Sequence, residues 1–446
     1  MRISRRTLLA GAGAAAAAAV VLPGGQQGRA VLDVRRFGAR GDGVTDDARA
    51  IQTAVAALRP HSTLYFPTGS YRFARHRPAG DAAVVIAGLS DVAVEFGPGA
   101  ELLMDNLDST SGTGAGHGLL VHGPASRIAL RNIRIRWAGN ARRSFGDGIR
   151  VLGGPTVAAP PRGWPGPVTG VTLTDCVVQG CPQAGVIMMG VSDIAVSGLR
   201  VTGTRADGLH FNACRRARIQ DYRAVDTGDD GLALVTYFSP DPAFDADSAT
   251  FSFPALTDWS NTDFTVADVR VTGGKANGVR MAGAHRVAVT GLAVDGVRSG
   301  AAVMVDSAAP GADAGWNYVA SRGVRLDDVA ASHCDMGIHL LARPGESGDR
   351  RFTDFDVAVS DVTLDECDNW SVRAESLTDR QIRGLQVANC RISSSSTTGG
   401  NGGLGIGSAR DISLADVSIR HTKSVRAFDT VNTGGLKVDR LSVNQP

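Results

Sequence analysis

A glycine that opens a short apolar run recurs along the middle of the chain at a nearly constant spacing. Gly185, Gly208 and Gly231 are 23 residues apart, and Gly278 and Gly300 are 22 apart. A unit of this length, with two or three short strands, cannot close a core alone, whereas stacked units bury a continuous one. A leucine-rich repeat needs helical returns, and a propeller blade needs about twice the length. The spacing therefore predicts a solenoid of stacked β-coils.

A second set of short runs alternates apolar and polar residues with period two, as half-buried strands do. These runs lie at residues 194–199, 217–222, 264–269, 287–292, 324–329, 357–362 and 412–417. The longer gaps from Gly148 to Gly185 and from Gly231 to Gly278 each fit one coil plus an inserted loop. We therefore predict an all-β chain that forms one single-stranded, right-handed parallel β-helix over residues 31–446.

The start of this region departs from the repeat. Residues 48–58 have apolar positions at helical spacing behind Asp47, which can serve as an N-cap, so we expect a helix that caps the solenoid. The stretches FGARGDGVTDD (37–47), AIQTAV (50–55) and LYFPTGSY (64–71) resemble the N-terminal signature of the pectin-lyase-like β-helix superfamily. This resemblance implies the fold but no single chemistry, because lyases, hydrolases and phage spikes share it.

Aligning the coils on the repeated glycine produces two polar columns on one outer face. Asp207 and Asp230 precede the glycine in neighbouring coils, and Asp229 lies beside Asp230. Three carboxylates so close repel one another, which raises the pKa of at least one. Glycoside hydrolysis uses such a pair, a protonated acid and an ionised base. The alternative is turn chemistry, since Asp-Gly is a common turn pair.

The residues around these carboxylates resemble three families of inverting glycoside hydrolases. TGDDGLAL (227–234) and ADGLHF (206–211) are similar to motifs of the family 28 polygalacturonases, and of the dextranases and α-1,3-glucanases of families 49 and 87. The resemblance implies that Asp229 is the general acid and that Asp207 and Asp230 activate water. The polygalacturonase lysine that follows Arg280 is Ala282 here. A neutral α-glucan is therefore slightly preferred over polygalacturonate as substrate.

Several other side chains are candidates for substrate binding. His210 and Arg280 share the outer column that flanks the aspartates, and Lys275, Asp147 and Arg150 are further candidates. The stretch 237–264 interrupts the repeat and holds seven of the 24 aromatic residues, including Tyr237 and Trp259. Aromatic faces stack on sugar rings, so this insert is a candidate wall of the site, although a small satellite core is the alternative.

Two other function classes remain open. A polysaccharide lyase or epimerase needs a cation site and a basic proton acceptor, and residues 229–264 contain no Lys or Arg to supply the base. A non-catalytic glycan-binding surface solenoid would tolerate loss of the acid cluster. We therefore predict a hydrolase without a cofactor or a bound metal, acting on a polysaccharide or oligosaccharide.

The first 30 residues have the pattern of an export signal. Arg5 and Arg6 form a twin-arginine pair ahead of an alanine-rich apolar run at residues 8–22, and Gly28-Arg29-Ala30 offers a small-x-small cleavage site. We predict a twin-arginine signal peptide at residues 1–30. The mature protein would be secreted or held at a bacterial cell surface, without membrane association after cleavage.

The composition excludes a few other roles. Lys and Arg number 46 and Asp and Glu 44, so the chain lacks the basic excess of nucleic-acid-binding proteins. The six cysteines show no metal-finger spacing, and we expect buried apolar side chains, with disulfides as the alternative. The 56 glycines have no collagen period and indicate many tight turns. We expect a monomer.

Overall fold

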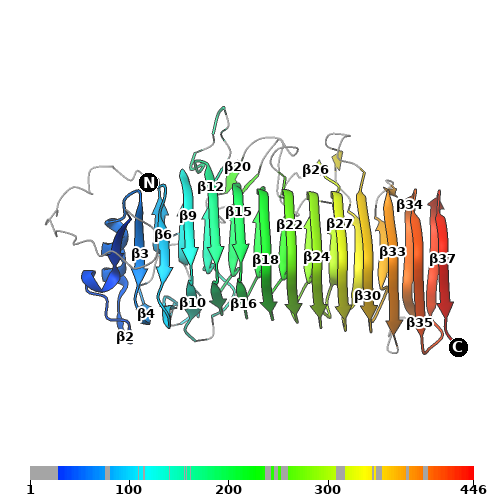
Figure 1. The fold of residues 1–446 in the computed structure, drawn as a ribbon, viewed down its shortest axis with the longest axis horizontal. Helices are drawn as coiled ribbons and strands as arrows, with labels where there is room; N and C mark the ends of the chain where they lie inside the picture. The colour runs from blue at the N-terminus through cyan, green and yellow to red at the C-terminus, as the bar shows by residue number, and fades with distance from the viewer. Residues whose placement is uncertain are drawn as a thin grey trace.

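The chain winds into one elongated parallel β-helix, with β1 (Ala30–Asp33) near one end and β37 (Lys437–Asn444) at the other (Figure 1). The computed structural model describes residues 29–446 except 76–80, 109, 114–115, 140, 155, 157, 161, 237–242, 246–249, 253–259, 308–316, 344–345, 348–353, 378–380 and 395–399. Within this described part, no helix is long and apolar enough to cross a membrane. The predicted all-β architecture is confirmed.

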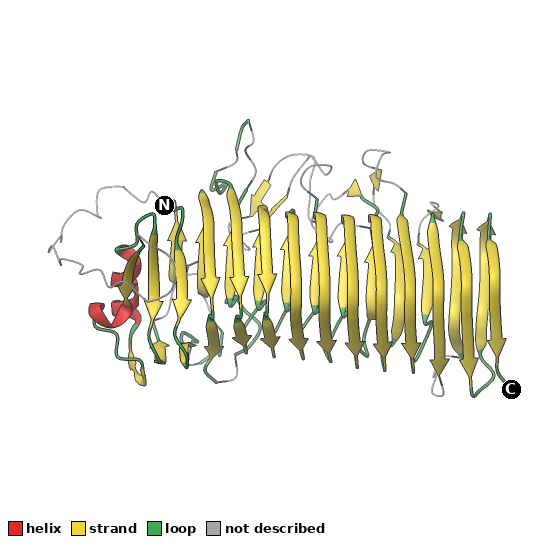
Figure 2. Cartoon of the chain, in the orientation of Figure 1, coloured by secondary structure: helices red, strands yellow, loops and turns green. Residues whose placement is uncertain are grey.

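Two long sheets run along the helix axis (Figure 2). Sheet A has 20 strands: β1, β2 (Asp42–Asp46), β3 (Ser62–Phe66), β4 (Gly69–Phe73), β6 (Ala93–Phe96), β7 (Ala100–Met104), β9 (Ala125–Arg131), β10 (Arg134–Trp137), β12 (Val168–Thr174), β13 (Val177–Gln179), β15 (Val191–Ser197), β16 (Arg200–Thr202), β18 (Arg215–Val225), β22 (Thr262–Thr272), β24 (His285–Asp295), β27 (Arg322–Ser332), β30 (Asp356–Asp365), β33 (Leu385–Ser394), β35 (Ser413–His421) and β37. Sheet B has 13 strands: β5 (Ala82–Ala87), β8 (His117–His122), β11 (Ile149–Leu152), β14 (Val186–Met189), β17 (Leu209–Asn212), β19 (Leu232–Val235), β23 (Val279–Ala282), β25 (Ala301–Asp306), β28 (Met336–Ala342), β31 (Val372–Ser376), β32 (Ile382–Arg383), β34 (Asn401–Arg410) and β36 (Arg426–Gly434). Two short pairs lie outside these sheets: β20 (Ala243–Asp245) with β21 (Thr250–Ser252), and β26 (Asn317–Tyr318) with β29 (Glu346–Ser347).

Sheet A turns a corner within each coil. At this corner one residue of each coil has a left-handed backbone, with φ between 48° and 66°, and these corner residues are neighbours across the stack. They are Asn132, Asp175, Gly198, Asp221, Asp268, Gly291, Asp328, Asp361, Asn389, Asp416 and Arg440. Asn, Asp and Gly enter this region at low cost. The alternating runs are strands as predicted, but their polar fifth position is a corner that the alternation did not indicate.

The repeated glycines are needed because a larger side chain would not fit, and not because the backbone conformation demands glycine. A Cβ added to Gly148, Gly185, Gly208, Gly231 or Gly278 would lie 2.5–2.7 Å from a carbonyl oxygen of the next coil. None of the five has a positive φ. These glycines allow neighbouring coils to approach closely, a role that the expectation of many tight turns did not include.

The predicted register fails after Gly278. Val279 pairs with Val303, so Ala302, not Gly300, is the equivalent of Gly278. The 22-residue spacing there does not mark equivalent positions, because this coil has 24 residues from Val279 to Val303.

A helix covers the N-terminal end of the stack, as predicted (Figure 2). Helix α1 (Ala48–Ala56) follows η1 (Val34–Phe37) and β2, buries Ile51 and Ala54, and ends two residues before the predicted boundary. Asp47 is the N-cap residue by position, but its side chain does not cap the helix. Its carboxylate instead accepts hydrogen bonds from the N–H groups of Arg40 and Gly41.

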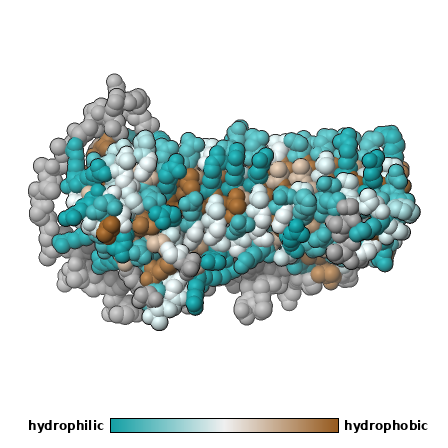
Figure 3. Space-filling model, turned by 90° about the horizontal axis from the view of Figure 1, so that it is seen from below, coloured by the Kyte–Doolittle hydropathy of each residue, from teal (hydrophilic) through white to brown (hydrophobic). Residues whose placement is uncertain are grey.

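The interior holds a continuous column of apolar side chains, and the outer surface is largely hydrophilic in Figure 3, with scattered apolar patches. All six cysteines are buried and free, which confirms the expectation of apolar packing over disulfides. The core thus fixes the coils in register, and sheet B presents a row of outward side chains whose spacing is set by the stack.

Candidate active site

The outward column of sheet B is present as predicted. The strand register pairs Arg150, Ile187, His210, Ala233 and Arg280 in successive coils. Met304 follows Arg280 and precedes His339, a position that the glycine alignment missed. These side chains alternate with inward residues that belong to the core, so the column marks one outer face of the solenoid.

The three aspartates come together in the turns that directly precede β17 and β19. One oxygen each of Asp207, Asp229 and Asp230 lies within 4.8 Å of the other two. Asp230 is buried, the Asp207 side chain is 16% exposed, and the Asp229 side chain is 41% exposed. The three residues therefore form one acid cluster, in which Asp229 is the member most open to solvent.

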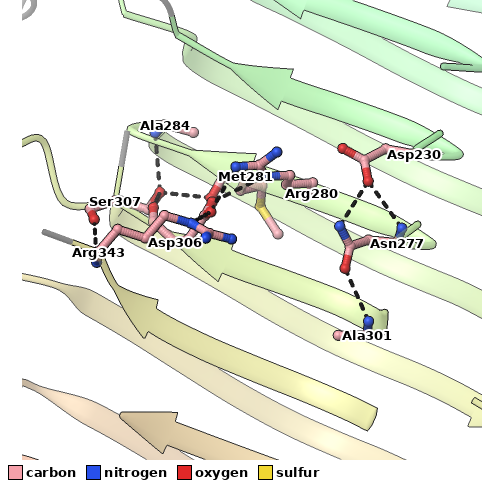
Figure 4. Close-up of polar contacts among 10 residues, drawn as sticks. Asp230, Asn277, Arg280, Met281, Ala284, Ala301, Asp306, Ser307 and Arg343 are labelled. Atoms are coloured by element: carbon pink, nitrogen blue, oxygen red, sulfur yellow. Dashed lines mark hydrogen bonds and ion pairs between the residues drawn. The ribbon is translucent and has the colours of Figure 1, made fainter. Parts of the chain in front are cut away.

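Hydrogen bonds between coils orient two of the carboxylates. Asp207 Oδ2 lies 2.7 Å from His210 Nδ1, and Asp207 Oδ1 accepts the N–H of Asp230 at 3.1 Å. Asp230 Oδ1 accepts two hydrogen bonds from Asn277, from its backbone N–H at 3.0 Å and from Nδ2 at 2.8 Å (Figure 4). Asn277 Oδ1 then accepts the N–H of Ala301 at 3.0 Å. Each side chain of this ladder thus binds the backbone of the next coil.

Burial and mutual repulsion favour the protonated form of two aspartates. Burial, together with the charge of Asp207, raises the pKa of Asp230 to about 7, against the opposing charge of Arg280. The pKa of Asp229 is also raised, first by burial and then by Asp207, while Arg143 and Arg280 oppose the shift. The cluster therefore holds a proton at a pH where an isolated aspartate would be ionised.

The chain bends at Gly228 and Asp229, directly before Asp230. A Cβ on Gly228 would lie 2.4 Å from the backbone of Arg205, so only glycine fits at this bend. The bend therefore places Asp229 outside the regular strand that begins at Leu232. It does not move Asp229 away from the other carboxylates, since all three stay within 4.8 Å.

A buried carboxylate holds two arginines beside the acid cluster (Figure 4). Asp306 is fully buried and lies 2.9 Å from Arg280 Nη2 and 2.7 Å from Arg343 Nε. Both guanidinium groups are about one-third exposed. Arg280 therefore lies in the predicted outer column, with a fixed orientation and a second cation next to it. Its contact with substrate stays a prediction.

The sequence analysis did not identify Asp306, Arg343 or Arg143. Asp306 ends the apolar strand β25, and the mistaken register after Gly278 hid its place in the outer face. Arg143 lies in the loop before β11, and its Nη2 is 3.8 Å from Asp229 Oδ2. No spacing rule in the sequence indicated that this loop reaches the aspartates.

Asp147 and Arg150 require a correction. Both are buried, and they form a charged cluster with buried His117: Asp147 Oδ2 lies 3.5 Å from Arg150 Nε and 3.2 Å from His117 Nδ1. Burial raises the pKa of Asp147 and lowers that of His117 well below its usual value. Their burial argues against direct substrate contact.

The remaining candidates are placed differently. Lys275 is exposed, and its N–H binds Thr227 O at 3.1 Å, which brings its backbone to the turn that carries Asp229. Tyr237 and Trp259 lie outside the described residues. Among the described residues, the acid cluster is the one group of three that could hold a metal ion, although both oxygens of Asp207 already have protein partners.

Comparison with known proteins supports the fold throughout the chain and a sequence family only at its start. Residues 31–78 match the family model "Rhamnogalacturonase A/epimerase, pectate lyase-like". A 56-residue stretch is 45% identical to alginate lyase 7 of Azotobacter vinelandii, and it covers 12% of this chain and 6% of that protein's length.

Solved structures resemble nearly the whole chain at low identity. The family 28 exopolygalacturonase of Yersinia enterocolitica has a TM-score of 0.64 and 14% identity, covering 93% of this chain and 79% of that one. The family 87 α-1,3-glucanase of Streptomyces thermodiastaticus has a TM-score of 0.52 and 14% identity, covering 94% and 70%. A mannuronan C-5 epimerase module of Azotobacter vinelandii has a TM-score of 0.50 and 12% identity, covering 93% and 99%.

These neighbours define the class of fold. The chain is a right-handed parallel β-helix, as predicted, and its residues 31–78 match a pectate-lyase-like family model, as the resemblance in its first coils implied.

Proposed function

We propose that this protein is a secreted glycoside hydrolase that cleaves a polysaccharide by acid–base chemistry at Asp207, Asp229 and Asp230. The observation that carries the proposal is the convergence of three carboxylates within 4.8 Å, one of them with a pKa raised to about 7. A protonated carboxyl beside an ionised one is the arrangement that glycoside hydrolysis needs.

The exposures of the side chains support an assignment of roles. Asp229 is the most accessible of the three and would donate its proton to the glycosidic oxygen as the bond to the leaving sugar breaks. Asp207 and Asp230 would orient a water, and the ionised member of this pair would accept its proton as the water oxygen bonds to the anomeric carbon. His210 and Asn277 would fix the two bases through the hydrogen bonds that they make to them.

The stereochemical outcome is a separate part of the proposal. The family resemblance implies inversion at the anomeric carbon. Inverting enzymes usually separate their carboxyl groups by about 6.5–9.5 Å, and retaining enzymes by about 5–5.5 Å. The oxygens here approach within 4.8 Å. Inversion therefore rests on the resemblance alone, and NMR of the first product formed tests it directly.

Two substrate classes have support. Ala282 stands where polygalacturonases have a lysine, which favours a neutral α-glucan. Arg343 adds a second guanidinium beside Arg280, and the two share one carboxylate. The resulting excess of positive charge favours an anionic glycan such as polygalacturonate as the second candidate.

The test is a reducing-sugar assay of the purified protein on α-1,3-glucan, dextran and polygalacturonate. Asp229→Asn and Asp207→Asn should each lower kcat by roughly 10²–10⁴-fold, the usual scale of general acid–base catalysis. Asp226→Asn, on an exposed aspartate of the same coil, is the matched control and should keep full activity.

Two outcomes would contradict the proposal. Full activity in Asp229→Asn would reject the site. An unsaturated uronate product, detected by its ultraviolet absorbance, would instead support a lyase, in which a basic group such as Arg143 or Arg280 removes a proton.

A further inference from the structure

The outer face of sheet B is closed on the N-terminal side of the acid cluster. The outward side chains of β8, β11 and β14 form an apolar cluster, and the partly buried Trp164 packs against it. Its outward members Leu120, Leu152, Ile187 and Met189 are each less than 7% exposed. A row of aliphatic side chains on an outer face would be exposed to solvent if it lined an open groove.

The polar residues of the same region are covered as well. Asp147, Arg150 and His117 are at most 1% exposed, although Asp147 and Arg150 occupy the same outer columns as Asp207 and His210. A glycan lying along the outer column could not contact these side chains. The surface available to substrate therefore ends at the coil of Asp207.

Residues 141–146 form a wall at this boundary. The segment starts on the coil of β11 and extends along the stack: Ser144 N–H binds Pro182 O at 3.1 Å, and Arg205 Nε binds Ala141 O at 2.8 Å. From this anchored segment Arg143 reaches Asp229, which lies three coils beyond Asp147 in register. Arg205 lies two residues before Asp207, so the turn that carries this carboxylate also anchors residues 141–146.

The acid cluster is accessible on its other side. Asp229 is 41% exposed and Arg280 is 29% exposed, and Asn277, on the coil of Arg280, is half-buried. The outward residues Met304 and Leu341 of the following coils are buried again. The reacting carboxylates thus lie at the edge of the covered region, directly beside Arg143. Little space separates the proposed acid from the wall.

From this geometry we infer that the protein acts on chain ends, in an exo mode, and that Arg143 contacts the terminal sugar against the wall formed by residues 141–146. The inference rests on the proposed hydrolase function and adds the mode of action. A polymer cannot continue past Asp229 along the outer column, because Arg143 and the covered face of β8, β11 and β14 occupy that path. Cleavage then releases a short product from one end of the chain.

The experiment follows product size and polymer mass together on polygalacturonate and, in parallel, on α-1,3-glucan. We expect one product of one or two sugar units from the first time point, while the average polymer mass stays nearly constant. A ladder of intermediate oligosaccharides with a rapid fall in polymer mass would overturn the exo mode and leave the hydrolase function standing. No cleavage of either polymer would overturn both.

Variants of neighbouring arginines test the wall itself. Arg143→Ala should raise KM for a short oligosaccharide by about tenfold, which corresponds to about 1.4 kcal/mol, with a smaller change in kcat. It should also add longer products. Arg134→Ala, on an exposed arginine of β10 outside the wall of residues 141–146, is the control and should behave as the unaltered protein. An unchanged KM and product pattern in Arg143→Ala would contradict the role of Arg143.

Discussion

Asp230 is a carboxylate held in a place that favours its neutral form. It is buried, it faces Asp207 and Asp229, and its Oδ1 is bound by Asn277. Burial raises its pKa to about 7, well above the 3.8 of an exposed aspartate. Ionisation of Asp230 therefore lowers the stability of the folded state, by an amount that depends on pH.

Asp230→Asn should remove that cost. Because the folded pKa is raised, the contribution to stability is complete below about pH 4 and is lost as pH rises through about 7. The variant should match the original protein in Tm near pH 4 and exceed it near pH 8 by at least about 2 °C, the scale of a change of about 1 kcal/mol in a large domain. Asp226→Asn should show no such divergence, and equal Tm differences at both pH values would refute this account of Asp230.

The same proton predicts the alkaline limit of activity. If Asp229 and Asp230 must retain one proton between them, the rate should fall as pH rises through about 7, since repulsion and burial raise both pKa values. Arg143→Ala removes a charge that holds the pKa of Asp229 down, while Asp207, Asp230 and Arg280 still face that group. The alkaline limb of a kcat/KM profile should therefore move to higher pH in this variant. An unchanged alkaline limb would show that Arg143 does not affect the pKa of the catalytic acid.

Residues carried by the repeat were the ones that the sequence could locate. Asp207, Asp230 and Arg280 follow the glycine period, so their shared face was predictable from spacing. Arg143 and Arg343 lie in connecting segments, where no period applies. Asp147 and Arg150 were placed in the correct columns but assigned the wrong environment, because column position does not show whether a loop covers it.

At the scale of strands, the spacing between coils depends on glycines that lack room for a side chain. Gly185→Ala would place a Cβ 2.4 Å from Val201 and 2.7 Å from Gly208 O, so it should destabilise the fold by about 1–3 kcal/mol, as overpacking does. Gly407→Ala, with no atom within 4 Å of the added Cβ, is the control and should be neutral or slightly stabilising. Equal denaturation midpoints for the two variants would contradict the spatial explanation.

The corner residues of sheet A are constrained by backbone conformation instead, because they must adopt a left-handed φ. Asp268 has φ of 53°. Asp268→Asn should be tolerated, whereas Asp268→Val should cost about 1–2 kcal/mol because a β-branched residue resists the left-handed region. Urea denaturation of the two variants would distinguish them. The alternation of apolar and polar residues could not predict this corner, because the apolar residues stay inside while the chain changes direction.

At the scale of the molecule, we propose that the export signal sends the folded solenoid across the membrane. Replacing Arg5 and Arg6 with lysine should trap the precursor inside the cell, because twin-arginine export requires that pair. Cell fractionation and immunoblotting of the two precursors make the comparison. Export of the lysine variant at normal levels would show that another route is used.

The stack also determines how the proposed site responds to heat. Asp207, Asp230, Asn277 and Asp306 belong to four successive coils, so the distances between them are distances between coils. No local loosening can separate these groups while the coils stay paired. Activity and β-structure should therefore be lost at the same temperature when an assay and circular dichroism are followed together. Loss of the proposed activity would then mark the melting of the solenoid, and each kcal/mol gained in coil packing would extend the temperature range over which that activity persists.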